Sequence, residues 1–380
     1  MKKIFTSEVV LSGHPDKMCD LIADHILDAY LSEDKDSRVA CEVIASNRKV
    51  VIMGEITSKA KIDVEKIARQ VIIDIGYDND ELGFNGSNIP ILIDLNKQSP
   101  DIALGLKDSN LGAGDQGIMY GYATNETENY MPLVHNLACS LAQKLELARK
   151  NRVISGLRPD GKVQITLSYE NDKISAEAII VSIQHEESKV PDILRSEITE
   201  QVIKKVIPTS MLTPDTKIFI NPTGRFVIGG PAGDSGLTGR KICVDTYGGL
   251  AHHGGGAFSG KDYTKVDRSA AYYARYVAKN IVASKLADVC EVSIAYAIGI
   301  ANPVQVTIDT FGTAKVNEEE LLAVVKEVFD FTPQNIIAEL HLKEVSYKDI
   351  TVFSHFGKNN LPWEQLDKVE LLQAKFAEKE

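Results

Sequence analysis

The chain has 380 residues, of which 44% are hydrophobic and 25% are charged, and its formal net charge is -11. This length and composition are typical of a globular protein with two or three domains, and the acidic balance argues against a nucleic-acid or anionic-membrane partner. No apolar run approaches the roughly 18 residues of a membrane span, and the N-terminal residues are too polar for a secretory signal, so we expect a cytoplasmic protein.

An amphipathic helix is predicted from Pro15, because apolar residues recur at helical spacing as far as Tyr30. Proline suits the first helical turn, which puts His14 at the N-cap or just before it. Asp16 then lies in the first turn, where backbone NH groups favour an anion. The two polar residues could equally serve only to cap the helix and to complement its dipole.

A β-hairpin follows, formed by residues 38–45 and 50–56 around a polar turn. Alternation places Glu42 on the face opposite the apolar residues of the first strand, and we expect both Glu42 and Glu55 to face solvent. Two further elements complete this first group, namely a helix over 63–75 and a strand over 90–95.

The same order of elements, a helix, a hairpin, a helix and a strand, is predicted twice more. The second copy consists of a helix over 131–149, strands over 163–170 and 175–184, a helix over 191–207 and a strand over 217–220. The third consists of a helix over 268–284, strands over 290–300 and 304–311 and a helix over 318–329. We therefore predict an α+β fold of three similar units about an approximate three-fold axis, with boundaries at 1–100, 111–228 and 229–380.

The stretch 221–268 holds 12 of the 27 glycines. Interleaved with them are six cations and four carboxylates, namely Arg225, Arg240, Lys241, Lys261, Lys265, Arg268, Asp234, Asp245, Asp262 and Asp267. Freed backbone amides, cations and a few carboxylates are what a polyphosphate held with a divalent metal requires. A flexible solvated loop is the alternative, but the apolar residues within the stretch disfavour it.

Several common nucleotide and metal motifs are missing. Neither a P-loop nor a Rossmann glycine pattern occurs, and His252 and His253 have no third ligand at metal spacing. The five cysteines, odd in number and without CxxC spacing, are expected to be reduced core thiols. The segment 97–114 has no periodicity and is therefore either a linker or a lid.

Seven short motifs together resemble the S-adenosylmethionine synthetase (methionine adenosyltransferase) family. They are GHPDK at 13–17, GAGDQG at 112–117, ATNET at 123–127, LRPDGK at 157–162, FINPTGRFVIGGP at 219–231, GLTGRK at 236–241 and GGGAFSGKD at 254–262. The resemblance is colinear from near residue 4 to the HFG and PWE segments at 355–364 and so covers nearly the whole chain.

The resemblance implies that methionine sulfur attacks C5′ of ATP and that the released triphosphate is then cleaved to pyrophosphate and phosphate. It also implies two Mg²⁺ ions per site, a K⁺ ion, and a homo-oligomer in which dimers share active sites and often pair into tetramers. Stabilising a leaving triphosphate is a positioning and electrostatic task that needs no general base.

The resemblance also implies roles for individual residues. The catalytic residues would be His14, Lys162, Arg240, Lys241 and Lys265. The ATP contacts would be His14, Asp115, Asp160, Lys162, Arg225, Phe226, Asp234, Arg240, Lys241, Ala257 and Lys261. The methionine contacts would be Glu55, Gln98, Asp234 and Lys265. The metal ligands would be Asp16 and Asp267 for Mg²⁺ and Glu42 for K⁺.

The chain departs from the family pattern at Leu11-Ser12, at His252 and in the stretch 101–111, which bears on potassium dependence and on a lid expected over 98–110. A non-catalytic nucleotide sensor and an ATP-dependent kinase or ligase are the alternative functions. A sensor should have lost some of the phosphate-binding cations or magnesium carboxylates, and this chain keeps them.

Overall fold

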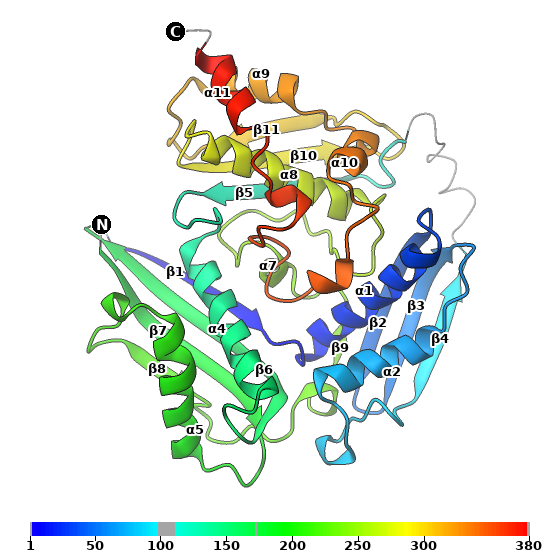
Figure 1. The fold of residues 1–380 in the computed structure, drawn as a ribbon, viewed down its shortest axis with the longest axis vertical. Helices are drawn as coiled ribbons and strands as arrows, with labels where there is room; N and C mark the ends of the chain where they lie inside the picture. Colours follow the sequence, from blue (N-terminus) through cyan, green and yellow to red (C-terminus); the bar gives the residue numbers. More distant parts are fainter. Residues whose placement is uncertain (1, 98–110, 172, 378–380) are drawn as a thin grey trace.

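A computed structural model describes residues 2–97, 111–171 and 173–377. In these residues three β-sheets are arranged around a common centre (Figure 1). The strands are β1 (Lys3–Val10), β2 (Arg38–Ser46), β3 (Lys49–Thr57), β4 (Ile91–Asn96), β5 (Gly117–Thr124), β6 (Leu157–Glu170), β7 (Lys173–His185), β8 (Lys217–Ile220), β9 (Gly236–Leu237), β10 (Val289–Tyr296) and β11 (Gln305–Asp309). The helices are α1 (Pro15–Glu33), α2 (Val64–Ile75), α4 (Leu133–Lys150), α5 (Pro191–Ile198), α6 (Lys204–Val206), α7 (Ile242–Asp245), α8 (Val266–Ala283), α9 (Glu318–Val328), α10 (Pro333–Glu339) and α11 (Val369–Ala377).

Each sheet contains one strand that comes from another unit of the chain. The sheet orders are β4-β3-β2-β9, β1-β6-β7-β8 and β11-β10-β5. Strand β1 precedes α1 but pairs with β6, β5 precedes α4 but pairs with β10, and β9 precedes α8 but pairs with β2. The three units therefore exchange strands in a cycle, which joins them into one body.

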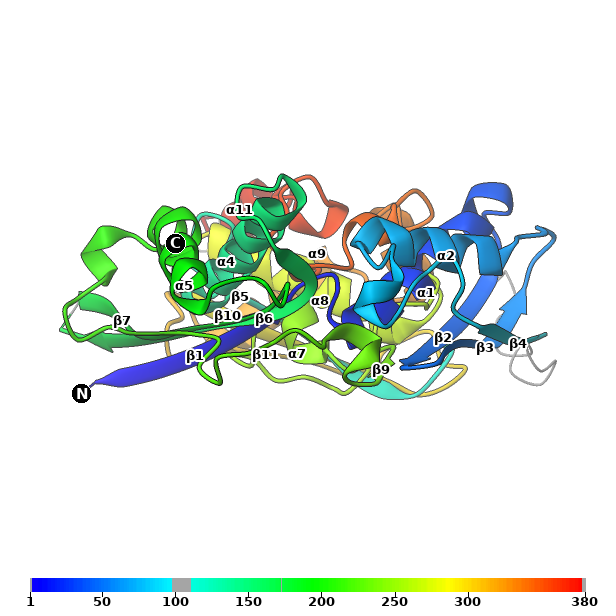
Figure 2. The ribbon, with the colours of Figure 1, turned by 90° about the horizontal axis from the view of Figure 1, so that it is seen from below.

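One long helix packs on each sheet and brings its apolar face to the core. Met18 and Ile22 of α1 lie in the same core cluster as Val43 of β2. Helix α8 approaches β5 so closely that a Cβ at Gly121 would lie 1.9 Å from the backbone of Ala274. Figure 2 shows that the helices lie on one side of the sheets and leave the other side flatter.

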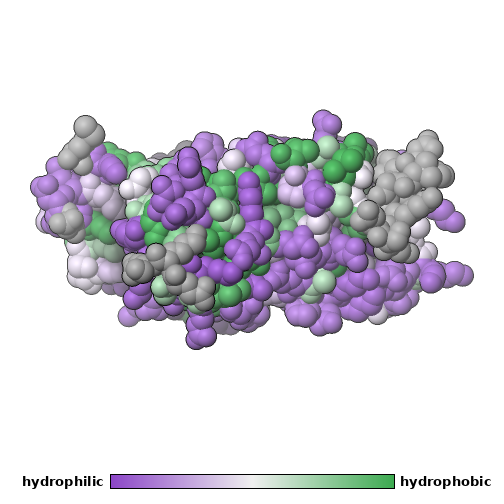
Figure 3. Space-filling model, turned by 90° about the horizontal axis from the view of Figure 1, so that it is seen from above, coloured by the Kyte–Doolittle hydropathy of each residue, from purple (hydrophilic) through white to green (hydrophobic). Residues whose placement is uncertain are grey.

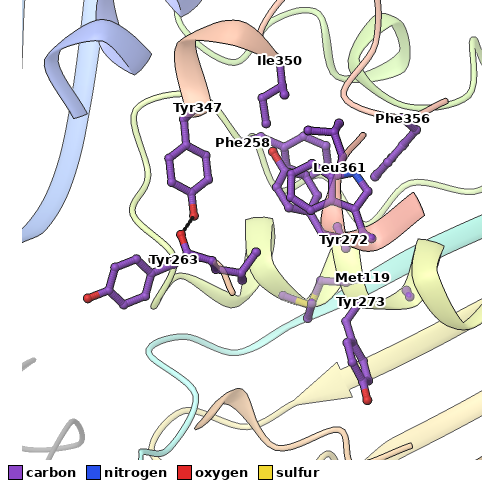
Figure 4. Close-up of a cluster of buried hydrophobic side chains, with 14 of the residues drawn as sticks. Met119, Phe258, Tyr263, Tyr272, Tyr273, Tyr347, Ile350, Phe356 and Leu361 are labelled. Atoms are coloured by element: carbon purple, nitrogen blue, oxygen red, sulfur yellow. Dashed lines mark hydrogen bonds between the residues drawn. The ribbon is translucent and has the colours of Figure 1, made fainter. Parts of the chain in front are cut away.

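An aromatic cluster fills the space beneath α8 (Figure 4). The rings of Tyr272 and Trp363 stack at 4.0 Å between centroids, and Phe258 meets Tyr272 edge-on at 5.4 Å. Phe258 lies in the glycine-rich stretch, and the cluster therefore anchors that stretch to the core. Such rings bury a large apolar area and prefer these offset and edge-on geometries.

The prediction of three α+β units is confirmed, with two differences. The strand that follows the second helix in the other two units is missing from the third within the described residues, since α10 follows α9 there. The exchanged strands β1, β5 and β9 were not predicted at all. The cysteines are all free, but Cys243 is exposed, so the prediction of core thiols was wrong for that residue.

Figure 3 looks onto the end formed by the C-terminal unit, where hydrophobic residues interrupt a mostly hydrophilic face. Among the described residues, no helix is both long and apolar enough to cross a membrane.

Candidate active site

The start of helix α1 carries the first group of predicted residues. His14 is the N-cap, and its Nδ1 accepts a hydrogen bond from the amide of Asp16 at 3.2 Å. Burial and the neighbouring Lys241 lower the pKa of His14 to about 4. The ring is therefore neutral near pH 7, and because Nδ1 is an acceptor, its proton lies on Nε2.

Asp16 lies close to two cationic side chains of the segment 236–241. Its Oδ2 lies 2.6 Å from Lys241 Nζ, and its Oδ1 lies 3.6 Å from Arg240 Nε. The same Oδ1 accepts the amide of Leu237 at 3.0 Å. Burial alone would raise the pKa of this carboxyl, but the bonds from Lys241 and Leu237 hold the pKa below its usual value. We call His14, Asp16, Arg240 and Lys241 the α1 site.

The start of helix α8 repeats this arrangement. Asp267 is the second residue of α8, and its Oδ2 lies 2.5 Å from Lys261 Nζ. Lys265 pairs with the buried Asp262 at 2.5 Å, and Asp262 also accepts the amide of Val39. A Cβ at Gly256 would lie 2.4 Å from Asp267 Oδ1, so the glycine loop passes directly over this carboxylate. We call Lys261, Asp262, Lys265 and Asp267 the α8 site.

The central unit places two predicted residues beside the α1 site. Lys162 lies in β6, where it pairs with Val10 at the end of β1, and its charge contributes to the lowered pKa of His14. Asp160 is buried, and its Oδ2 accepts the amide of Gly230 at 2.8 Å. Burial raises the pKa of Asp160 to about 6, although the Gly230 amide opposes the shift.

The predicted nucleoside contacts lie around the segment 225–234. Arg225 is exposed and pairs with Glu187 at 3.0 Å, and the amide of Phe226 donates to the His185 ring. Asp234 is exposed and contributes to the raised pKa of Asp160, so the two carboxyls lie near one another.

Two other predicted ATP contacts lie apart from this segment. Ala257 is half-buried, and a Cβ at Gly239 would lie 2.5 Å from the Ala257 Cβ, so the two glycine loops touch there. Asp115 is exposed in the loop that leads into β5.

Glu42 and Glu55 lie on the uncovered face of the first sheet, and both are exposed as the alternation predicts. Ala40 pairs with Glu55 and Glu42 with Met53, which puts both glutamates on one face. Partial desolvation raises the pKa of Glu42, and Lys261 of the α8 site opposes the shift. Gln98 and the predicted lid over 98–110 lie outside the described residues.

The carboxylates of the two sites suit a Mg²⁺ ion that is also bound by the phosphates of a substrate. In the described parts of the chain, no group of three or more His, Cys, Asp or Glu side chains is arranged so that it could bind a metal ion by itself. Asp16 and Asp267 each offer a carboxylate beside a lysine instead. Mg²⁺ commonly binds through one or two carboxylates together with phosphate oxygens, so this donor set fits the ion when a polyphosphate is present.

Two further carboxylates contact the glycine-rich segments and were not predicted. Asp20 accepts the amide of Gly239 at 2.8 Å, and Asp24 accepts the amide of Gly260 at 2.9 Å. Their four-residue spacing from Asp16 along α1 is visible in the sequence. Acidic residues on a helix are usually solvated, so this spacing alone does not predict contacts to the glycine-rich segments.

Known proteins are similar to this chain over nearly its whole length. The S-adenosylmethionine synthetase N-terminal, central and C-terminal domains match residues 2–100, 110–226 and 228–365 respectively. An S-adenosylmethionine synthase of Finegoldia magna is 50% identical, with 98% of this chain and 99% of the relative covered. Those of Clostridium tetani and Clostridium botulinum are each 49% identical, with 97% of this chain and 98% of the relative covered. The chain therefore belongs to the S-adenosylmethionine synthetase family, a family of methionine adenosyltransferases.

Proposed function

We propose that the chain joins ATP and L-methionine at the α1 and α8 sites and then hydrolyses the triphosphate there. The observation that carries the proposal is a concentration of cations in an acidic protein: Lys241 and Lys261 each pair with a carboxylate in the first turn of a helix. Family membership supplies the two substrates, and the uses of the residues below are proposals.

In the first reaction the methionine sulfur attacks C5′, and the bond between C5′ and the triphosphate oxygen breaks. The sulfur carries no proton, so the step yields a sulfonium and needs no base. The neutral His14 ring has a donor at Nε2, which can hydrogen-bond the oxygen that leaves C5′. Lys162, Arg240 and Lys241 take up the charge that develops on the triphosphate.

In the second reaction water cleaves the terminal phosphate from the triphosphate that is still bound. We assign Arg240 to this step, because its guanidinium can bridge two phosphoryl oxygens and is largely exposed toward solvent. Mg²⁺ held by Asp16 and Asp267 would supply charge neutralisation on the phosphates in both steps.

The methionine and potassium assignments rest on the family resemblance. Glu55, Asp234 and Lys265 are proposed for methionine, together with Gln98, and Glu42 is proposed for K⁺. Glu42 and Glu55 share one sheet face, and the segment 260–262, which contributes Lys261 and Asp262 to the α8 site, runs along β2 beside them. The proposed methionine and potassium groups therefore adjoin the α8 site.

The direct test is to incubate the protein with ATP, methionine and Mg²⁺ and to follow products by mass spectrometry. The proposal expects a sulfonium product with equal amounts of pyrophosphate and phosphate. Formation of ADP would indicate a kinase, and formation of AMP an adenylating ligase. ATP binding without any product would indicate a nucleotide sensor.

We also propose a homo-oligomer whose active sites lie between chains. The uncovered sheet faces carry exposed apolar residues alongside the proposed contacts, and enclosing so polar a ligand is easier with walls from two chains. The exposed apolar residues on these faces are Ile4, Met53, Leu92 and Phe219.

Mixing inactive variants tests the shared site. If one active site combines the α1 site of one chain with the α8 site of its partner, Asp16→Asn and Asp267→Asn chains should complement each other. Random mixing would restore about a quarter of wild-type activity, because half of the dimers would each contain one intact site. Complete absence of activity after subunit exchange, or an active monomer by light scattering, would contradict the shared site.

A further inference from the structure

Helix α1 carries four aspartates at a spacing of four residues, and together they accept backbone amides from three distant segments of the chain. Asp16 accepts the amide of Leu237 at 3.0 Å, Asp20 that of Gly239 at 2.8 Å, and Asp24 that of Gly260 at 2.9 Å. Asp28 accepts the amides of Tyr347 and Lys348, both at 2.9 Å. Residues four apart lie on one face of a helix, so the four carboxylates form a ladder.

The two middle aspartates hold the backbone next to the cations proposed for phosphate binding. Gly239 directly precedes Arg240 and Lys241, and Gly260 directly precedes Lys261. The same two segments also pair with β2, since Thr238 donates its amide to Val43 and Cys41 donates its amide to Gly260. Each segment is therefore fixed between the edge of the sheet and helix α1.

Buried cations pair with these two aspartates. Lys17 lies 2.8 Å from Asp20 and also bonds Asp245. Arg268 donates two hydrogen bonds to the carboxylate of Asp24, at 2.8 and 3.0 Å, and a third to the carbonyl of Lys261. Removing one partner of a buried ion pair is costly, so these pairs help to hold the two aspartates in place.

We propose that Asp20 and Asp24 are positioning residues for triphosphate, with Asp20 setting the backbone that presents Arg240 and Lys241 and Asp24 setting the backbone that presents Lys261. This inference rests on the proposed function. Long cationic side chains repel one another and lose rotamer freedom when they converge on one ligand. A fixed backbone at their base reduces that cost, and a small displacement of the backbone weakens several phosphate contacts at once.

Asp28 provides a matched control within the same helix. It makes the same kind of carboxylate-to-amide bonds, but Tyr347 and Lys348 adjoin no residue assigned to the substrates. Replacing Asp28 should therefore disturb packing without disturbing the phosphate cations.

The experiment compares Asp20→Ala, Asp20→Asn and Asp28→Ala in the full chain. The measurements are the Kd for Mg²⁺-triphosphate by calorimetry, and KM and kcat for triphosphate cleavage, all well below each variant's Tm. Asp20→Ala should raise the Kd and KM about tenfold, because the amide of Gly239 loses its acceptor. Asp20→Asn keeps an acceptor without the charge and should raise both about threefold, whereas Asp28→Ala should change neither by more than about twofold.

A folded Asp20→Asn variant with unchanged Kd and KM would overturn the assignment, even if Asp20→Ala does not fold. An equal rise in Asp28→Ala would also overturn it, since the effect would then be general loosening of α1. The binding measurement keeps this inference separate from the proposed function. If the wild-type chain binds triphosphate but forms no sulfonium, the proposed reaction is wrong. The role of Asp20 is still tested in that case by comparing the Kd for triphosphate between the variants and the wild type.

Discussion

The α1 site and the α8 site use the same local design in different surroundings. Each has an aspartate as the second residue of a long helix and a lysine paired to it, at 2.6 Å for Asp16 and 2.5 Å for Asp267. The side chain of Asp16 is only 3% exposed and also holds the amide of Leu237, whereas that of Asp267 is 23% exposed.

The third long helix of this kind, α4, has no acidic residue in its first turn. Its first amide instead bonds Glu126 of the preceding loop at 2.8 Å. The three-fold repeat supplies three helix starts, and local side chains give two of them an aspartate paired with a lysine, the arrangement that we propose binds phosphate together with Mg²⁺.

The largest expected effect comes from neutralising these two aspartates. Asp16→Asn and Asp267→Asn should each lower sulfonium formation by roughly 10²–10³-fold, because each removes a proposed Mg²⁺ ligand. The comparison predicts that excess Mg²⁺ restores more activity to Asp267→Asn, since Asp16 also fixes the loop backbone. Rates measured against Mg²⁺ concentration test this, and equal recovery of both variants would show that the two sites do not differ.

The next effect separates two residues within the α1 site. His14→Asn should lower sulfonium formation by roughly 10²-fold and triphosphate cleavage far less, because only the first reaction breaks the bond at C5′. Arg240→Leu should lower triphosphate cleavage at least as much as sulfonium formation. Each variant is assayed with ATP plus methionine and with triphosphate alone. Equal losses in both assays would mean that the two residues only bind the phosphates and have no separate roles in the two reactions.

A smaller effect concerns the protonation of His14. In the free protein its pKa is lowered to about 4 by burial and by Lys241, and bound triphosphate should raise the pKa by offsetting that lysine. Titration of its ring resonance by NMR, assigned with His14→Asn, checks both values. A pKa near 6.5 in the free protein would contradict the burial of this ring.

The same shift has a consequence for stability. Because the folded pKa lies below the unfolded value near 6.5, the unfolded chain binds more protons between those pH values. The contribution of His14 is therefore fully present above pH 6.5 and is lost as the pH falls toward 4. Unfolding of His14→Asn, followed over this range, should depend less on pH than that of the wild type.

The smallest effect is expected at the exposed pair of Arg225 and Glu187, whose side chains are 60% and 78% exposed. Glu187→Gln should shift the Tm by no more than about 2 °C, because solvent screens such pairs. The KM for ATP should stay within about twofold, since Arg225 keeps its place in the chain. A larger fall in stability would mean that this pair is held as firmly as the one at Asp16.

Local residue patterns are enough to predict the repeated helices and hairpins and the loops proposed to bind the substrates. Helical periodicity and strand alternation are local properties, so the elements around Pro15, Glu42 and Arg268 could be predicted from their own residues. The motifs around His14, Lys241 and Lys261 likewise pointed to a polyphosphate site. The assignments of individual ligands remain predictions from the family resemblance.

How the units join and which groups hold the glycine-rich segments became visible only in the folded chain. Strand β9 is Gly236–Leu237, too short for any periodic signal, and β1 and β5 pair with strands of other units. The aspartates of α1 look in the sequence like an ordinary solvated helix face, because their partners are backbone amides more than 200 residues away. Every residue except proline has a backbone amide, so a hydrogen bond to an amide requires no particular residue type in the partner segment. Such a contact therefore cannot be predicted from the sequence and is seen only in the folded chain.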